Sequence, residues 1–223
     1  AGVPMSRIVT ARPLTRDGRG CPACKGERMS HERTADMTSA CPDTTTRSAR
    51  RYVSPRTRPL TSEEAQIRAL AYAIKDPGCD QDLVDAAARE MAQLIQGERG
   101  HLIPVPSHTR STLANRRLAF AIAFCTGGKF TVSDILDRKE PTESACERHR
   151  NRLPPLEPDG HGIYLHRPDK ITLTGTEKIY FVDNVITSGN TLQACRRAMM
   201  GLGTGLVYAD AHHDIPNRIA QEA

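Results

Sequence analysis

The chain has 223 residues, of which 38% are hydrophobic and 26% are charged, and it contains no Trp. These proportions are typical of a globular protein with an aliphatic core. The longest unbroken apolar run, residues 118–125, is far shorter than the ~18 residues that a membrane-spanning helix needs, so we expect no membrane-embedded segment.

The net charge of +5 is unevenly distributed, because residues 1–60 hold 12 of the 31 basic residues and only 5 of the 26 acidic ones. This segment has too few large aliphatic residues to offset the entropy lost on folding. We therefore expect a basic, disordered N-terminal tail over 1–60 and one folded domain over 61–223. Any contact with nucleic acid is expected from the tail alone.

The cysteines are odd in number and scattered, at positions 21, 24, 41, 79, 125, 146 and 195. This pattern does not resemble a disulfide framework and favours a reducing, cytoplasmic location. Cys21 and Cys24 are half of a zinc module, which only His31 and Cys41 could complete. Zinc at these four residues is one interpretation, and a tail with free thiols is the other.

The domain is predicted to open with two helices. Thr61 and Glu64 form a capping box before an apolar helical pattern that ends at residues 76–78, and a second helix covers about 80–96. A short strand at 101–106, with two prolines, precedes a helix over about 111–125. Residues 126–170 are proline-rich and charged, and we expect a mobile insertion there.

Strands are predicted at 163–165, 171–173, 178–182 and 206–209, with a helix after the third that carries Leu192, Cys195 and Met199 on its inner face. Strands that alternate with helices predict an α/β fold with a mostly parallel, Rossmann-like sheet flanked by helices.

The stretch IYFVDNVITSGNT (179–191) is the most informative one. A buried strand ends at Asp183 and Asn184, and a loop from Thr187 to Thr191 leads into a helix. Ligands bind at the carboxyl ends of parallel strands, and hydroxyls, a Gly and free backbone N–H groups at a helix N-terminus form an anion site. An acid directly before such a loop suits a sugar phosphate.

This stretch resembles the phosphoribosyl-pyrophosphate motif of the class I phosphoribosyltransferases. The resemblance implies that Asp183 holds the ribose hydroxyls and Mg²⁺ and acts in catalysis. It also implies that Asn184 lies at the ribose and that a loop wraps the 5′-phosphate. That loop comprises Thr187, Ser188, Gly189, Asn190 and Thr191. The chain departs from the family at Asn184, where a second carboxylate is common.

Two further segments resemble the competence-type (ComF-like) branch of this family. LIPVPSHTRSTLANRRLA (102–119) is similar to its first strand and pyrophosphate loop, which implies pyrophosphate contacts from Ser107, His108, Thr109 and Arg110 and places Arg116 and Arg117 where the branch carries arginines. DILDRKEPTESACERHRNR (134–152) is similar to its flexible catalytic loop, with Arg138 and Lys139 as the implied catalytic contacts.

The resemblance implies an enzyme that transfers phosphoribose from Mg²⁺-bound phosphoribosyl pyrophosphate to a nitrogenous base, releases pyrophosphate, and can form a homodimer. Two alternatives remain open at this point. One is a regulatory protein that binds phosphoribosyl pyrophosphate without catalysis, and the other is an accessory protein of DNA uptake whose basic tail contacts DNA.

Overall fold

A computed structural model describes residues 46–54, 58–171 and 176–211, all of which belong to the compact unit Cys41–Ala223. Its elements are β1 (Thr46–Arg51), α1 (Ser62–Ala73), α2 (Gln81–Gln93), β2 (Gly100–Pro104), α3 (Leu113–Cys125), β3 (Phe130–Val132), β4 (Leu136–Arg138), α4 (Ala145–Arg150), η2 (Pro158–His161), β5 (Ile163–Leu165), η3 (Pro168–Lys170), β6 (Lys178–Ile186), α5 (Asn190–Ala198) and β7 (Thr204–Asp210). The elements η2 and η3 are short 3₁₀ helices.

The main sheet has five strands in the order β1-β7-β6-β2-β3, and every neighbouring pair is parallel. The chain passes from β2 through α3 to β3 on one side, and from β6 through α5 to β7 on the other. The strand order therefore reverses between the adjacent strands β2 and β6. In open parallel sheets, ligands bind beyond the carboxyl ends of the strands at such a reversal.

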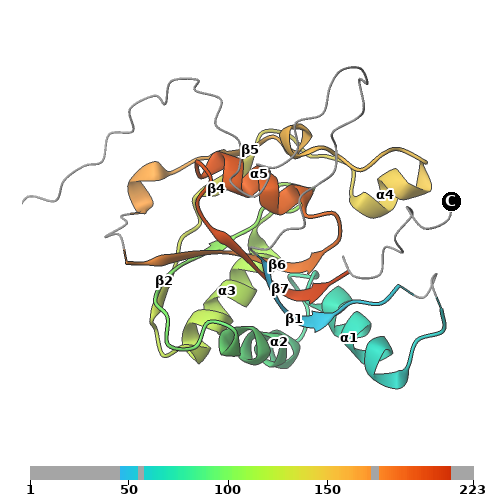
Figure 1. The fold of residues 1–223 in the computed structure, drawn as a ribbon, viewed down its shortest axis with the longest axis horizontal. Coiled ribbons are helices and arrows are strands. Elements are labelled where there is room, and N and C mark those ends of the chain that lie inside the picture. Colours follow the sequence, from blue (N-terminus) through green and yellow to red (C-terminus); the bar gives the residue numbers. More distant parts are fainter. Residues whose placement is uncertain (1–45, 55–57, 172–175, 212–223) are drawn as a thin grey trace, which may run out of the picture. The chain divides into compact units, whose positions relative to one another are not determined.

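Both faces of the sheet are covered, as a parallel sheet requires. Helices α1, α2 and α3 lie on one face and α5 lies on the other, on the same side as the antiparallel pair β4–β5 (Figure 1). Alternate residues of β6 point to opposite faces of the sheet. Tyr180 and Val182 pack on the face covered by α1, α2 and α3, and Ile179 and Phe181 pack on the face covered by α5. The predicted α/β fold with a mostly parallel, helix-flanked sheet is thus confirmed.

Local sequence signals account for the helix starts. The Thr61 side chain accepts a hydrogen bond from the Glu64 N–H, and the Glu64 carboxylate accepts one from the Thr61 N–H, as the capping box predicts. The Asp80 side chain caps α2 in the simpler way, by accepting from the Asp82 N–H. These caps fix the two helices at the residues where the sequence places them.

The expected boundary of the tail at residue 60 is wrong, because residues 46–51 form β1. This strand completes one edge of the sheet by pairing with β7, and the Arg47 side chain ties it to the end of α2. Its alternating Arg, Ser and Thr residues carry little apolar signal, since an edge strand can leave one face exposed to water. The Cys21, Cys24, His31 and Cys41 set lies outside the described residues.

The segment 126–170 is more ordered than a mobile insertion. It contains β3, which extends the main sheet, and the β4–β5 pair, which packs beside α5. Of the strand expected at 171–173, only Ile171 lies within the described residues. In the described part of the chain, none of the helices is long and apolar enough to cross a membrane.

Candidate functional site

A cavity of about 560 Å³ opens at the carboxyl ends of β2 and β6, where the strand order reverses. Val105, Pro106, Ser107 and His108 approach it from the end of β2. The other predicted site residues in its wall are Arg138, Asp183, Asn184, Thr187, Ser188 and Thr191. Residues that the resemblance assigned to ribose, phosphate and pyrophosphate therefore share one cavity, although they come from distant parts of the sequence.

The Asp183 carboxylate lies in this wall with one of its two oxygens engaged. Its Oδ1 accepts hydrogen bonds from the Asn184 N–H at 2.8 Å and from Asn115 Nδ2 at 3.1 Å. Oδ2 has no hydrogen-bond donor among the described residues. Burial raises the pKa of this carboxyl above its ordinary value, although the Asn184 N–H, Lys75 and Asn115 favour the charged form. The arrangement leaves a single carboxylate oxygen available to a ligand.

Asn115 joins the two strands on either side of the cavity. It is 7% exposed, and its Nδ2 donates to the Val105 carbonyl at 2.8 Å as well as to Asp183. The sequence analysis missed this role, but a signal existed. Asn115 lies on the face of α3 that also carries Leu118 and Ile122, which are buried, and an amide on an apolar helix face requires a polar partner.

Asn184 is also buried, and its side chain is hydrogen bonded to the backbone of the next residue. Its Oδ1 accepts from the Val185 N–H at 2.9 Å. A carboxylate at this position could accept the same hydrogen bond, so the local geometry does not depend on the amide.

The loop between β6 and α5 presents three of its five predicted phosphate ligands to the cavity: Thr187, Ser188 and Thr191. Gly189 is the N-cap of α5 and has a φ of +77°, a conformation that favours glycine. The Asn190 amide does not line the cavity and instead donates to the Leu156 carbonyl at 2.9 Å. Gly189 and Asn190 thus shape the loop, and the other three residues line the cavity.

The loop after β2 contributes Ser107 and His108 to the cavity, but not Thr109 or Arg110. The Thr109 hydroxyl is hydrogen bonded to the Ser107 hydroxyl at 2.9 Å. Arg110 has a φ of +70° and its guanidinium lies 3.4 Å from Asp137. The structure therefore places the second half of the predicted pyrophosphate loop outside the cavity wall.

Arg138 is 2% exposed and does not belong to a flexible loop. Its guanidinium donates to the carbonyls of Pro106, Ser107 and His161 and to the Thr142 hydroxyl. These contacts hold the loop after β2 against the segment that leads to β5. The expected place of Arg138 on a flexible loop is wrong, because it lies in β4 and is held by these hydrogen bonds, whereas its contact with a ligand stays a prediction. Lys139 is exposed and lies outside the cavity wall.

His161 lines the cavity beside Arg138, with 3.2 Å between its Nδ1 and Arg138 Nη1. Burial, together with the positive charge of Arg138, lowers its pKa to about 4. The ring is therefore neutral at pH 7, and its unprotonated Nδ1 accepts from the guanidinium.

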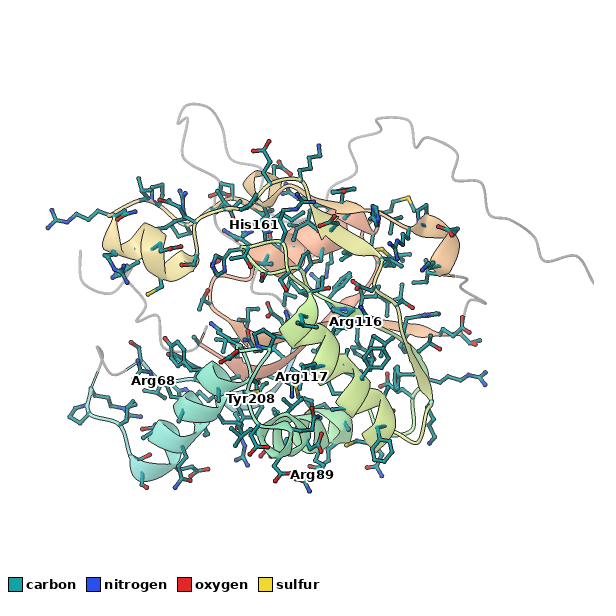
Figure 2. All side chains as sticks on the ribbon, turned by 180° about the vertical axis from the view of Figure 1, so that it is seen from behind. Arg68, Arg89, Arg116, Arg117, His161 and Tyr208 are labelled. Carbon is teal, nitrogen blue, oxygen red and sulfur yellow. The ribbon has the colours of Figure 1, made fainter. Side chains whose placement is uncertain are left out.

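Arg116 and Arg117 follow one another on α3, whereas His161 lies across the sheet on the α5 side (Figure 2). Neither arginine lines the cavity. Arg117 donates to the Cys79 carbonyl at 3.1 Å and to Gln81 at 2.8 Å, which fastens α3 to the start of α2. Arg116 lies 3.7 Å from Asp134. Both arginines hold elements of the fold together.

The cavity wall contains further residues that the sequence analysis missed, and most of them lie inside the segments 102–119 and 134–152, at positions to which the resemblance assigned no role. They are Lys75, Asn115, Thr142, Glu143, Ser144, Cys146, Arg148, His149 and His161. Lys75 follows α1, far from every motif, and no sequence pattern marks it. A larger cavity, of about 660 Å³, lies at the opposite ends of the strands between the last turns of α2 and α3, and it contains none of the predicted site residues.

Comparison of the chain with protein-family models, with curated proteins and with solved structures gave no match. Within the described residues, no group of three or more His, Cys, Asp or Glu side chains could hold a metal ion by itself. The available oxygen of Asp183 nevertheless fits Mg²⁺, which commonly uses one or two carboxylates together with the oxygens of a phosphate substrate.

Proposed function

We propose that the protein is a phosphoribosyltransferase that uses Mg²⁺ and phosphoribosyl pyrophosphate. One observation carries the proposal. A carboxylate with an available oxygen lies at the point of strand reversal, and the same strand continues into a hydroxyl-rich loop at the N-terminus of α5. In this order an acceptor for sugar hydroxyls is followed along the chain by an anion site in the same cavity, which suits a sugar phosphate.

Each group in the cavity has a role in this reaction. Asp183 Oδ2 would accept from the ribose hydroxyls or bind the metal, and the hydroxyls of Thr187, Ser188 and Thr191 would donate to the 5′-phosphate. Ser107 and His108, which line the same cavity, would contact the pyrophosphate. Mg²⁺, when bound, neutralises the leaving group, which is the largest electrostatic requirement of a displacement with oxocarbenium character.

The decisive experiment is incubation with phosphoribosyl pyrophosphate, Mg²⁺ and a panel of purine and pyrimidine bases, with pyrophosphate release as the readout. Asp183→Asn is expected to abolish release. Asp169→Asn, an exposed acid outside the cavity, is the matched control and should retain it. Absence of ligand binding by the wild type in calorimetry would overturn the proposal.

A second function is favoured by two features of the cavity. Asn184 stands in place of a carboxylate, and the Arg138 guanidinium donates to three carbonyls and a hydroxyl of the protein. Both reduce the charge available for catalysis. A regulatory protein that binds phosphoribosyl pyrophosphate would show tight binding without release of pyrophosphate for any base in the panel.

A further inference from the structure

Lys75 is a cation in the cavity wall that the motifs do not explain. It follows the last turn of α1, and its ammonium lies 5.3 Å from the centre of the Tyr72 ring. No carboxylate pairs with it among the described residues. The Tyr72 ring therefore holds the ammonium by a cation–π contact, which leaves its N–H donors available to another partner.

The other cations of the cavity are engaged. Arg138 donates to three carbonyls and one hydroxyl. Arg148 donates to the Pro154 carbonyl at 2.9 Å and lies 3.4 Å from Glu143. Among the Lys and Arg side chains that line the cavity in the described part of the chain, Lys75 is thus the one without a protein acceptor.

The position of Lys75 separates it from the loop after β2. Helix α1 packs against β1 and β7, and Ala211, the residue after β7, lines the cavity together with Lys75. Along the carboxyl edge of the sheet, Ser107 follows β2 and Asp183 lies on β6, whereas Lys75 follows α1, which packs against β7. Lys75 is close enough to Asp183 to favour its charged form, so the two face the same space.

We propose that Lys75 binds an oxyanion of the ligand on the β7 side of Asp183, so that the cavity has an anion site at each end. The inference rests on the proposed function and adds to it a substrate property. The oxyanion belongs either to the diphosphate of phosphoribosyl pyrophosphate or to a carboxylate on the acceptor base. With an acceptor that carries no negative charge, the diphosphate is the oxyanion that Lys75 would bind.

The test is calorimetry with the full-length protein, Mg²⁺ and three variants. Lys75→Met removes the charge, Lys75→Arg keeps it, and Lys129→Met removes an exposed lysine at the opposite edge of the sheet. Ribose 5-phosphate and phosphoribosyl pyrophosphate are each titrated into the free protein. Orotate and uracil, which differ by a carboxylate, are titrated into protein that is saturated with ribose 5-phosphate. Melting temperatures confirm that each variant is folded.

The affinity of Lys75→Met for ribose 5-phosphate is expected to stay within about twofold of the wild-type affinity, because that phosphate binds at the loop between β6 and α5. The substitution should weaken the binding of either phosphoribosyl pyrophosphate or orotate by at least ~10-fold, the effect expected when a charge-assisted hydrogen bond is lost. The first result identifies the diphosphate as the oxyanion, and the second, with uracil unaffected, identifies the acceptor carboxylate. Lys75→Arg should restore most of the affinity, and Lys129→Met should not differ from the wild type.

Two outcomes would overturn the inference, and they are distinguishable. Unchanged affinity of Lys75→Met for all four ligands, with wild-type protein that binds them, removes Lys75 from the site and leaves the proposed function intact. Failure of the wild type to bind either sugar phosphate removes the proposed function and the inference with it.

Discussion

The amide of Asn115 on α3 donates to the carboxylate of Asp183 on β6 across 3.1 Å, and to the carbonyl of Val105 after β2 across 2.8 Å. One buried side chain thus fixes the distance between the two strand ends that border the cavity. It also decides which oxygen of Asp183 is turned toward the ligand.

Asn115→Leu should weaken ribose 5-phosphate binding ~10-fold while it leaves the protein folded, because Asp183 loses a donor that holds its orientation. The same hydrogen bond favours the charged carboxylate, so its loss raises the pKa of Asp183 further and moves the binding profile to higher pH. Calorimetry from pH 5 to 8 measures both effects. A uniform loss of affinity with an unshifted pH profile would assign Asn115 a purely structural role.

Arg138→Met should destabilise the protein by about 3 kcal/mol, because several buried carbonyls lose their donor. The exposed neighbour Lys139→Met is the matched control and should change the free energy of unfolding by less than about 0.5 kcal/mol. Urea denaturation measures both. If Arg138→Met instead kept its stability and lost only ligand binding, the guanidinium would contact the ligand directly.

His161 should make the folded state sensitive to acid. Its pKa is about 4 in the folded protein, below the ordinary 6.5, so the unfolded chain takes up the proton first as the pH falls. The stabilisation is present above pH 6.5 and is lost as the pH falls toward 4. In urea denaturation across this range, His161→Asn should flatten the decline, whereas the exposed His149→Asn should leave it as in the wild type.

Gly189→Ala should lower the free energy of unfolding by about 1 kcal/mol, because the residue has a φ of +77°. The new Cβ would lie 3.7 Å from Ile186 Cδ1, an ordinary contact, so backbone strain alone sets this loss. Gly127→Ala, at a φ of +68° and away from the cavity, is the control for strain. Only Gly189→Ala should also weaken ribose 5-phosphate binding. Equal affinity of both variants would remove this loop from the site.

Deletion of residues 1–58 should destabilise the domain relative to deletion of residues 1–45. The longer deletion removes β1, the hydrogen bonds of Arg47 to the Leu94 carbonyl and to Glu98, and the contact of Arg47 with the Tyr180 ring. Thermal melting of the two shortened proteins measures the difference. Equal melting temperatures would show that β1 is dispensable.

Much of the fold follows from local signals in the sequence. The capping box at Thr61 and the apolar run before Asp183 mark α1 and β6 because caps and buried parallel strands have their own residue patterns. The strand β1 has no such pattern, since its position depends on pairing with β7 rather than on its own residues.

The part of the site that lies in contiguous sequence motifs was also predictable, and the part that tertiary packing brings together was not. The residues that follow β2 and β6 could be identified because a strand-to-helix motif is contiguous in the sequence. The tertiary packing brings Lys75, which follows α1, and Asn115 of α3 to the cavity. The buried Arg138 guanidinium donates to carbonyls from two separate segments, residues 106–107 and His161. The position of Asn115 on an apolar helix face was a signal, whereas the convergence at Lys75 and at Arg138 has no signature in a single sequence.

Because β1 pairs with β7, the sheet cannot be completed until late in synthesis of the chain. Among the described strands β1 is made first and its partner β7 last, so β1 cannot form this pairing until residues 204–210 leave the ribosome. Until then, its basic side chains oppose pairing of the strand with another chain. The arginines at positions 47, 50 and 51 would thus protect the nascent chain against aggregation before they contribute to the stability of the finished domain.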